Sequence, residues 1–195
     1  MADHLAQAER RAAGRRTAGW RAHWGTGEVI RPWLTTAARC GLAVVLALAG
    51  WAKVTEPAGL QKLAVASYHI LPDGMVSVVG VGLPVLELTL AALLVLGFAT
   101  RLAAVLSALL LIVFIAGIVS VWARGLSIDC GCFGGGGPAP RSGMGARYFR
   151  EILRDLGFLA LAGWIVVLPK SRLALDRLLG LYGDDDRGLD TERRR

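Results

Sequence analysis

Four long apolar segments, separated by polar or glycine-rich stretches, set the pattern of this chain. A helix needs about 20 mainly apolar residues to cross the hydrocarbon of a bilayer. The third segment contains no charged residue, and the first and fourth each end in a fully apolar run. The pattern therefore predicts an all-α integral membrane four-helix bundle, with spans at residues 34–52, 75–98, 102–122 and 147–168.

Three shorter stretches connect the predicted spans. Residues 58–70 have a weak amphipathic period, which predicts a short interfacial helix. Thr100 and Arg101 form so short a link that the second and third spans must be antiparallel. Residues 123–146 form the longest connection. Its dense glycines and prolines between Gly134 and Pro138 predict a loop without regular structure.

The composition also indicates a membrane protein. Of 195 residues, 54% are hydrophobic and 19% are charged, whereas soluble domains average about 45–50% apolar and about 25% charged residues. The charged residues gather toward the two ends of the chain. We therefore expect a basic, disordered tail at residues 1–30 and a charged tail at residues 170–195, on either side of a transmembrane domain at residues 31–169.

The distribution of basic residues predicts the topology. The net charge is +7, but the basic residues flank apolar segments and form no known recognition module, so we expect no nucleic-acid partner. Four spans place both termini on one side, together with 15 of the 22 basic residues. Basic residues mark the cytoplasmic side. We predict a multi-pass protein of the cell membrane with both termini in the cytoplasm and the loop at residues 123–146 outside it.

The loop carries a reactive-looking pair, Cys130 and Cys132, with one glycine between them. A disulfide across so small a ring is strained, and strained disulfides exchange readily with thiols. Nearby arginines, among them Arg124 and Arg147, are expected to lower the pKa of a thiol. A structural disulfide and two free thiols in a tight turn are alternative readings. A metal site that combines both thiolates with His69 is a third, although we expect no bound metal.

Other charged or reactive residues lie in or beside the predicted spans. Glu87 is a carboxylate near the middle of the second span, which indicates a functional site by default. It would be protonated and hydrogen-bonded, or paired with a cation such as Lys53, and its role would be proton relay, quinone contact or helix packing. We expect Arg39 in the headgroup region with its side chain extended outward, Cys40 as a small buried residue, and His69 as a proton carrier or a solvated loop residue.

Several short motifs, taken in order along residues 35–168, make the chain resemble the MauE/DoxX group of membrane proteins, and its MauE branch more closely. The most specific is Cys130-Gly131-Cys132-Phe133-Gly134. The others are Arg39 with Gly50-Trp51-Ala52-Lys53, Tyr68-His69-Ile70-Leu71-Pro72, Leu83-Pro84-Val85-Leu86-Glu87-Leu88, Arg124-Gly125, and Arg150 with Arg154-Asp155.

The resemblance implies a redox-associated membrane protein. MauE is linked to the maturation of methylamine dehydrogenase, and its relatives to thioredoxin-like extracytoplasmic proteins. DoxX relatives are linked to quinone-coupled chemistry. Carried onto this chain, the resemblance implies Cys130 and Cys132 as the catalytic pair, with supporting positions at Lys53, His69, Glu87, Arg124, Arg150 and Asp155.

Together these observations predict a membrane thiol–disulfide oxidoreductase. It would exchange electrons between a thioredoxin-like partner and a membrane quinone, with no covalently bound cofactor, in the maturation of disulfide-containing or redox proteins. Two alternatives remain open from the sequence. One is a non-catalytic membrane scaffold for an oxidoreductase complex, and the other is a small-molecule transporter that uses Glu87.

Overall fold

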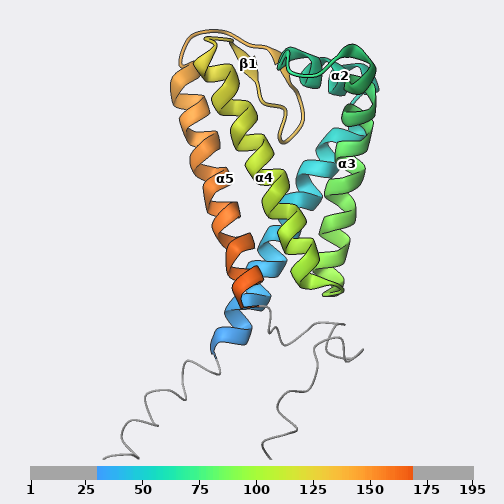
Figure 1. The fold of residues 1–195 in the computed structure, drawn as a ribbon, viewed down its shortest axis with the longest axis vertical. Coiled ribbons are helices and arrows are strands. Elements are labelled where there is room, and N and C mark those ends of the chain that lie inside the picture. The colour runs from blue at the N-terminus through green and yellow to red at the C-terminus, as the bar shows by residue number, and fades with distance from the viewer. Residues whose placement is uncertain (1–29, 169–195) are drawn as a thin grey trace, which may run out of the picture.

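The structure, a computed structural model, describes residues 30–168, so the two predicted tails lie outside the described part of the chain. The N-terminal helix Ile30–Thr55 is followed by α2 (Ala58–Ser67), α3 (Asp73–Leu96), α4 (Thr100–Ala123) and α5 (Met144–Val167). The long helices stand side by side, and the short α2 lies across one end of them (Figure 1). The described residues are mainly helical, as predicted, and α2 corresponds to the predicted interfacial helix.

Three of the described helices are long and apolar enough to cross a membrane: the N-terminal helix, α3 and α4. They correspond to the first three predicted spans, and each extends a few residues beyond at least one predicted end. α5 has the same length as α3 and α4, at 24 residues. It carries five charged residues in its first half and is not among the three. A fourth span at α5 therefore stays a prediction.

α3 and α4 are antiparallel, as their short connection predicts (Figure 1). Gly97 ends α3 in the left-handed conformation, with φ of 66°. The amides of Gly97 and Phe98 donate to the carbonyls of Leu94 and Leu93 at 3.3 and 3.1 Å. This arrangement satisfies carbonyls that the end of a helix leaves unpaired, so three residues are enough to reverse the chain.

A single apolar cluster joins the four long helices away from the cysteine loop. It includes Leu42, Leu46, Leu90, Leu94, Leu111 and Ile165, each at most 4% exposed. Polar residues of the N-terminal helix lie beside it, and Thr36 satisfies its hydroxyl by donating to the carbonyl of Pro32 at 2.8 Å. Arg39 is 2% exposed. The prediction of an outward-extended Arg39 is therefore wrong, because neighbouring helices enclose this side chain.

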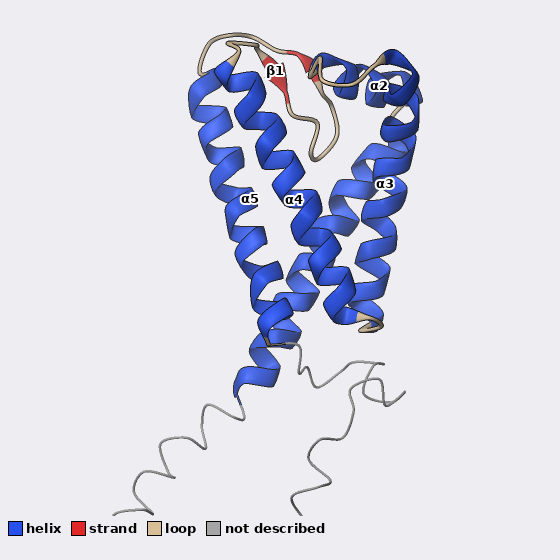
Figure 2. Cartoon of the chain, viewed as in Figure 1, coloured by secondary structure: helices blue, strands red, loops and turns tan. Residues whose placement is uncertain are grey.

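The cysteine loop contains regular structure that the sequence did not predict. β1 (Ile128–Asp129) pairs with β2 (Gly137–Pro138) in an antiparallel register, Ile128 opposite Pro138 and Asp129 opposite Gly137 (Figure 2). The amide of Ala139 continues the ladder by donating to the carbonyl of Ser127 at 2.9 Å. Pro138 lacks an amide donor, but the two-residue strand lies at a sheet edge where that loss is tolerated. The prediction of an irregular loop is thus wrong at this hairpin.

Candidate functional site

Lys53 joins the cysteine loop to the helices. It is 6% exposed near the end of the N-terminal helix. Its ammonium donates to both carboxylate oxygens of Glu87 on α3, at 2.8 and 2.9 Å, and to the carbonyl of Cys132 at 2.7 Å. An ammonium has three protons, and these three acceptors satisfy all of them. The predicted pairing of Glu87 with Lys53 is confirmed, and the pair also anchors the backbone at Cys132.

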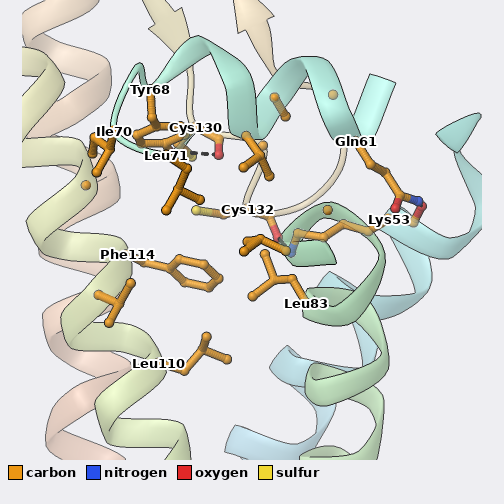
Figure 3. Close-up of a pocket in the computed structure, with 18 of the residues that line it drawn as sticks. Lys53, Gln61, Tyr68, Ile70, Leu71, Leu83, Leu110, Phe114, Cys130 and Cys132 are labelled. Atoms are coloured by element: carbon orange, nitrogen blue, oxygen red, sulfur yellow. Dashed lines mark hydrogen bonds between the residues drawn. The ribbon is translucent and has the colours of Figure 1, made fainter. Parts of the chain in front are cut away.

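Two tyrosines hold other parts of the loop backbone. The hydroxyl of Tyr68, the residue that follows α2, donates to the carbonyl of Cys130 at 3.0 Å (Figure 3). The hydroxyl of Tyr148 on α5 accepts from the amide of Ile128 at 3.0 Å and lies 3.0 and 3.1 Å from the carbonyls of Leu126 and Ile128. The two tyrosines therefore hold the loop backbone at Leu126, Ile128 and Cys130.

The glycines of the loop let its backbone pack directly on α2. A Cβ atom at Gly136, where φ is +107°, would lie 2.3 Å from the Cβ of Ala64. Nonbonded carbon atoms do not approach so closely, so only glycine fits this position. The amide of Gly135, next to it, donates to the carboxylate of Glu56. The glycine run is thus a packing surface rather than a flexible spacer.

Both cysteines of the pair are free thiols, and Cys132 is 7% exposed whereas Cys130 is half-buried. The hydrogen bond with Cys132 and burial raise the pKa of the Cys130 thiol. Burial also raises the pKa of the adjacent Tyr68 hydroxyl. The expectation that arginines lower the pKa of a thiol here is wrong for Cys130, since the hydrogen bond with Cys132, burial and neighbouring acidic groups raise its pKa.

The predicted arginines are engaged elsewhere. Arg124 donates to the carbonyl of Tyr68 at 2.6 Å, and Arg147 donates to the carbonyl of Pro140 at 2.7 Å. Arg154 lies within electrostatic range of both thiols. It is paired with the buried Asp155 at 3.0 Å, and its guanidinium lies 4.7 Å from the centre of the Phe133 ring. Arg124 and Arg147 therefore brace backbone, while Arg154 supplies positive charge near the pair.

A mainly apolar cavity of about 400 Å³ lies beside the two cysteines, between α2, α3, α4 and the loop. Lys53 of the N-terminal helix, Leu83 of α3 and Cys132 of the loop line it, and Phe114 of α4 lies opposite Lys53 and Leu83 (Figure 3). Val113 of α4 also lines the cavity and is 64% exposed. The cavity therefore reaches the outer surface of the helices, where a membrane-embedded protein meets lipid.

A second cluster of reactive groups contains Cys130 but not Cys132. The Cys130 sulfur and one carboxylate oxygen each from Asp129 and Glu151 lie within 4.8 Å of one another. Three donors are fewer than the four protein ligands of a structural zinc site. His69 does not belong to this cluster, so the geometry does not favour a metal site formed by the two cysteines and His69 within the described chain.

Three other predicted residues lie apart from the pair. His69 is exposed, with φ of +49°, and it does not line the cavity. Arg150 is exposed on α5. Cys40 is exposed as well, so the prediction that it is buried is wrong: it lies on the outward side of a helix whose inner side presents Leu42 and Ala43.

Sequence reasoning missed several residues of the site. Tyr148, Glu56 and Glu151 contact the loop from two different helical regions and belong to no motif. Tyr68 stood inside a quoted motif without an assigned role. The available signal for Tyr148 and Glu151 was their spacing of three residues, which places both on one face of α5.

Comparison with known proteins gives a consistent result. The family described as "Methylamine utilisation protein MauE" matches residues 31–168. A protein of Paracoccus denitrificans with the name "Methylamine utilization protein MauE" is 35% identical over 135 residues, which cover 69% of this chain and 69% of that protein. No solved structure matches. The matched region coincides with the described helices and includes the cysteine loop.

Proposed function

Because the chain belongs to the MauE family and is a multi-pass membrane protein, we propose that it is a thiol–disulfide redox protein of the membrane. Cys130 and Cys132 exchange electrons with a thioredoxin-like extracytoplasmic protein and with a membrane quinone. The observation that carries this proposal is that both thiols are free and both line one mainly apolar cavity.

The exchange with the protein partner follows ordinary thiol–disulfide chemistry. Cys130, the more exposed thiol, loses its proton and attacks one sulfur of the partner's disulfide, which releases the other partner sulfur as a thiolate. Cys132 then attacks the Cys130 sulfur in the mixed disulfide. The partner leaves as a dithiol and the Cys130–Cys132 disulfide has formed, so two electrons and two protons have passed to the partner. The reverse sequence oxidises the partner.

A membrane quinone completes the cycle. A quinone takes two electrons and two protons from the dithiol and becomes a quinol, and a quinol gives them back in the opposite direction. The cavity supports this proposal because its volume is within the range of ordinary ligand sites, about 300–1,000 Å³, and its lining is mainly apolar. The exposed Val113 on its lining gives a lipid-soluble molecule a lateral route from the bilayer.

The proposed topology has α5 as a fourth span and both termini in the cytoplasm. Two observations support it. The start of the N-terminal helix and the end of α5 lie at one end of the helices, and the cysteine loop lies at the other (Figure 1). Most basic residues of the sequence, 15 of 22, belong to the termini and the short connection at residues 97–99 and its flank. The cysteine loop then faces the compartment in which disulfides persist.

The physiological role we propose is the maturation of disulfide-containing or redox proteins. The Paracoccus denitrificans relative is named for methylamine utilisation, and we propose that this chain does a corresponding job for its own client. The scaffold and transporter alternatives are separated from this role by experiment. The transporter alternative requires a free Glu87, whereas both of its carboxylate oxygens accept from Lys53.

Trapping in cells tests the exchange. Cys132→Ser should accumulate a mixed disulfide between Cys130 and the partner, visible on a non-reducing gel and lost on reduction. Cys40→Ser, a substitution on the outer helix surface, is the matched control and should trap nothing. If neither Cys130→Ser nor Cys132→Ser traps a protein and the pair never changes oxidation state, the cysteines are structural and the scaffold alternative holds.

Filling the cavity tests the quinone. Purified reduced protein should reduce a soluble ubiquinone analogue with a stoichiometry of about one per Cys130–Cys132 pair, since two electrons are transferred. Leu83→Trp, inside the cavity, should slow this reaction. Leu86→Trp, on the same helix but 42% exposed and outside the cavity lining, should not. Equal rates for both variants would remove the quinone from this cavity.

A further inference from the structure

A carboxylate faces the more exposed thiol of the pair. Glu151 lies two turns into α5, and its carboxylate is next to the Cys130 thiol. The Cys130 sulfur and one oxygen of Glu151 belong to the cluster whose atoms lie within 4.8 Å of one another. Glu151 Oε2 is buried and has no hydrogen-bond partner among the residues of the described helices and loops. A buried acceptor of this kind has capacity for a proton.

The other groups that face Cys130 are less suited to accept its proton. The hydroxyl of Tyr68 donates to the loop and stays protonated, since burial raises its pKa. Arg154 is permanently protonated. Asp129 is exposed, and one of its oxygens accepts from the amide of Gly131 at 3.3 Å. Titratable groups near the thiol in the described part of the chain include Tyr68, Asp129, Cys132, Glu151 and Arg154.

We propose that Glu151 is the proton acceptor for Cys130 in thiol–disulfide exchange. This inference rests on the proposed function, since it assigns a residue to the same step. As Cys130 attacks the partner's disulfide, its thiol proton passes to Glu151 while the new S–S bond forms and the partner's S–S bond breaks. The released partner thiolate takes up a proton, which Glu151 can return. No further oxidant or reductant is needed for this step.

The assignment explains how a thiol with a raised pKa can react near neutral pH. The thiolate is the nucleophile, and burial together with the Cys132 hydrogen bond disfavours a free thiolate at Cys130. Transfer of the proton to Glu151 creates the thiolate without adding a net charge to the site. The population of this thiolate–carboxylic acid form does not change with pH while the pair holds one proton in total.

The pH dependence of a simple alkylation separates this role from a purely electrostatic one. The test uses the full chain in detergent with Cys40→Ser and Cys132→Ser, so that Cys130 is the single thiol, and iodoacetamide as the probe. With Glu151 present, the rate should fall with decreasing pH, level off over the pH range in which the pair holds one proton, and fall again below that range. With Glu151→Gln, the rate should fall about tenfold per pH unit throughout, with no level region.

At high pH the same variant should react faster than the parent. Glu151→Gln removes a negative charge that raises the pKa of Cys130, so its alkylation should be faster than the parent's at pH 9. The two profiles should converge at low pH, where Glu151 is protonated. A parent profile without a level region, or one identical to that of the variant, would overturn the proposal.

Asp129→Asn is the matched control, because it removes the other carboxylate of the cluster. It should keep the level region, and loss of that region would transfer the role to Asp129. Melting temperatures of all variants establish that the fold is intact. The alkylation assay needs neither partner nor quinone, so its outcome is independent of whether the cysteine pair cycles in cells.

Discussion

The Lys53 ammonium lies 2.8 and 2.9 Å from the two carboxylate oxygens of Glu87, where the N-terminal helix meets α3. Both side chains are nearly inaccessible, at 8% and 0% exposed. Removal of one partner leaves an uncompensated buried charge, which typically costs about 3–5 kcal/mol. The pair is also the attachment of the Cys132 backbone, so stability and the position of one thiol depend on the same contact.

Replacing one partner of this ion pair should therefore destabilise the protein more than replacing both partners together. Lys53→Met and Glu87→Gln should each lower the free energy of unfolding by about 3 kcal/mol or more, whereas Lys53→Met with Glu87→Leu should cost less than the larger single change. Denaturation in detergent measures all three variants. Lys62→Met, an exposed site on α2, is the control and should have little effect. A double variant that is worse than both singles would contradict this account.

The stability of the reduced protein should fall as pH rises above about 8.5, the ordinary pKa of a thiol. Because the pKa of Cys130 is raised in the folded state, the native protein keeps a proton that the unfolded chain has lost, and alkaline pH favours unfolding. This slope is at most about 1.4 kcal/mol per pH unit. Cys130→Ala should reduce the slope between pH 8.5 and 10, and Cys40→Ala should not, as followed by melting temperature with a reductant present.

A methyl group at Gly136 should displace the loop from α2. Its φ of +107° disfavours alanine, and the added Cβ would lie 2.3 Å from the Cβ of Ala64. The conformational part alone costs about 1–3 kcal/mol. Gly136→Ala should lower the melting temperature and speed proteolysis within the loop, and Gly136→Ala with Ala64→Gly should recover part of the loss. Gly135→Ala has strain but meets no atom closer than 4.0 Å, so it should be milder.

Tyr148→Phe should destabilise the protein more than Tyr68→Phe. The Tyr148 side chain is 1% exposed, and the amide of the buried Ile128 donates to its hydroxyl. A buried donor without a partner costs about 1–3 kcal/mol. The Tyr68 hydroxyl bonds a carbonyl beside the cavity, where water can replace it. Unfolding in detergent gives both values, and equal losses would show that the two hydroxyl groups are equivalent supports.

The helices were the predictable part of this molecule. Long apolar runs indicate membrane helices because unsatisfied backbone groups are costly inside a bilayer. The very short link between the second and third runs allows only an antiparallel arrangement of the two helices. The pairing of Lys53 with Glu87 was also predictable, since Glu87 is an isolated charge in an apolar segment and Lys53 is a cation at the end of another. Arg39 and Cys40 were mispredicted because the apolar pattern of a membrane helix does not tell its lipid-facing side from its protein-facing side.

The support of the loop was not predictable in the same way. Ala64 and Tyr148 contact the loop through pairings of distant segments, and neither residue type signals such a contact. From the sequence, Glu151 is expected to be an exposed charge in the first turns of a helix. It lies near Cys130 because of the orientation of α5 about its own axis, which the sequence does not determine. The hairpin between β1 and β2 depends on these contacts as much as on its own residues.

Gly134 to Gly137 all have positive φ, between 74° and 107°. Glycine loses more conformational entropy on folding than any other residue, so ordering this run of glycines is entropically unfavourable. The order comes from α2, the tyrosines and Lys53, which are all outside the run. When a partner or ligand breaks one of those contacts, the glycine run regains conformational entropy. Opening the loop to expose the two thiols therefore costs less free energy than opening a rigid turn would.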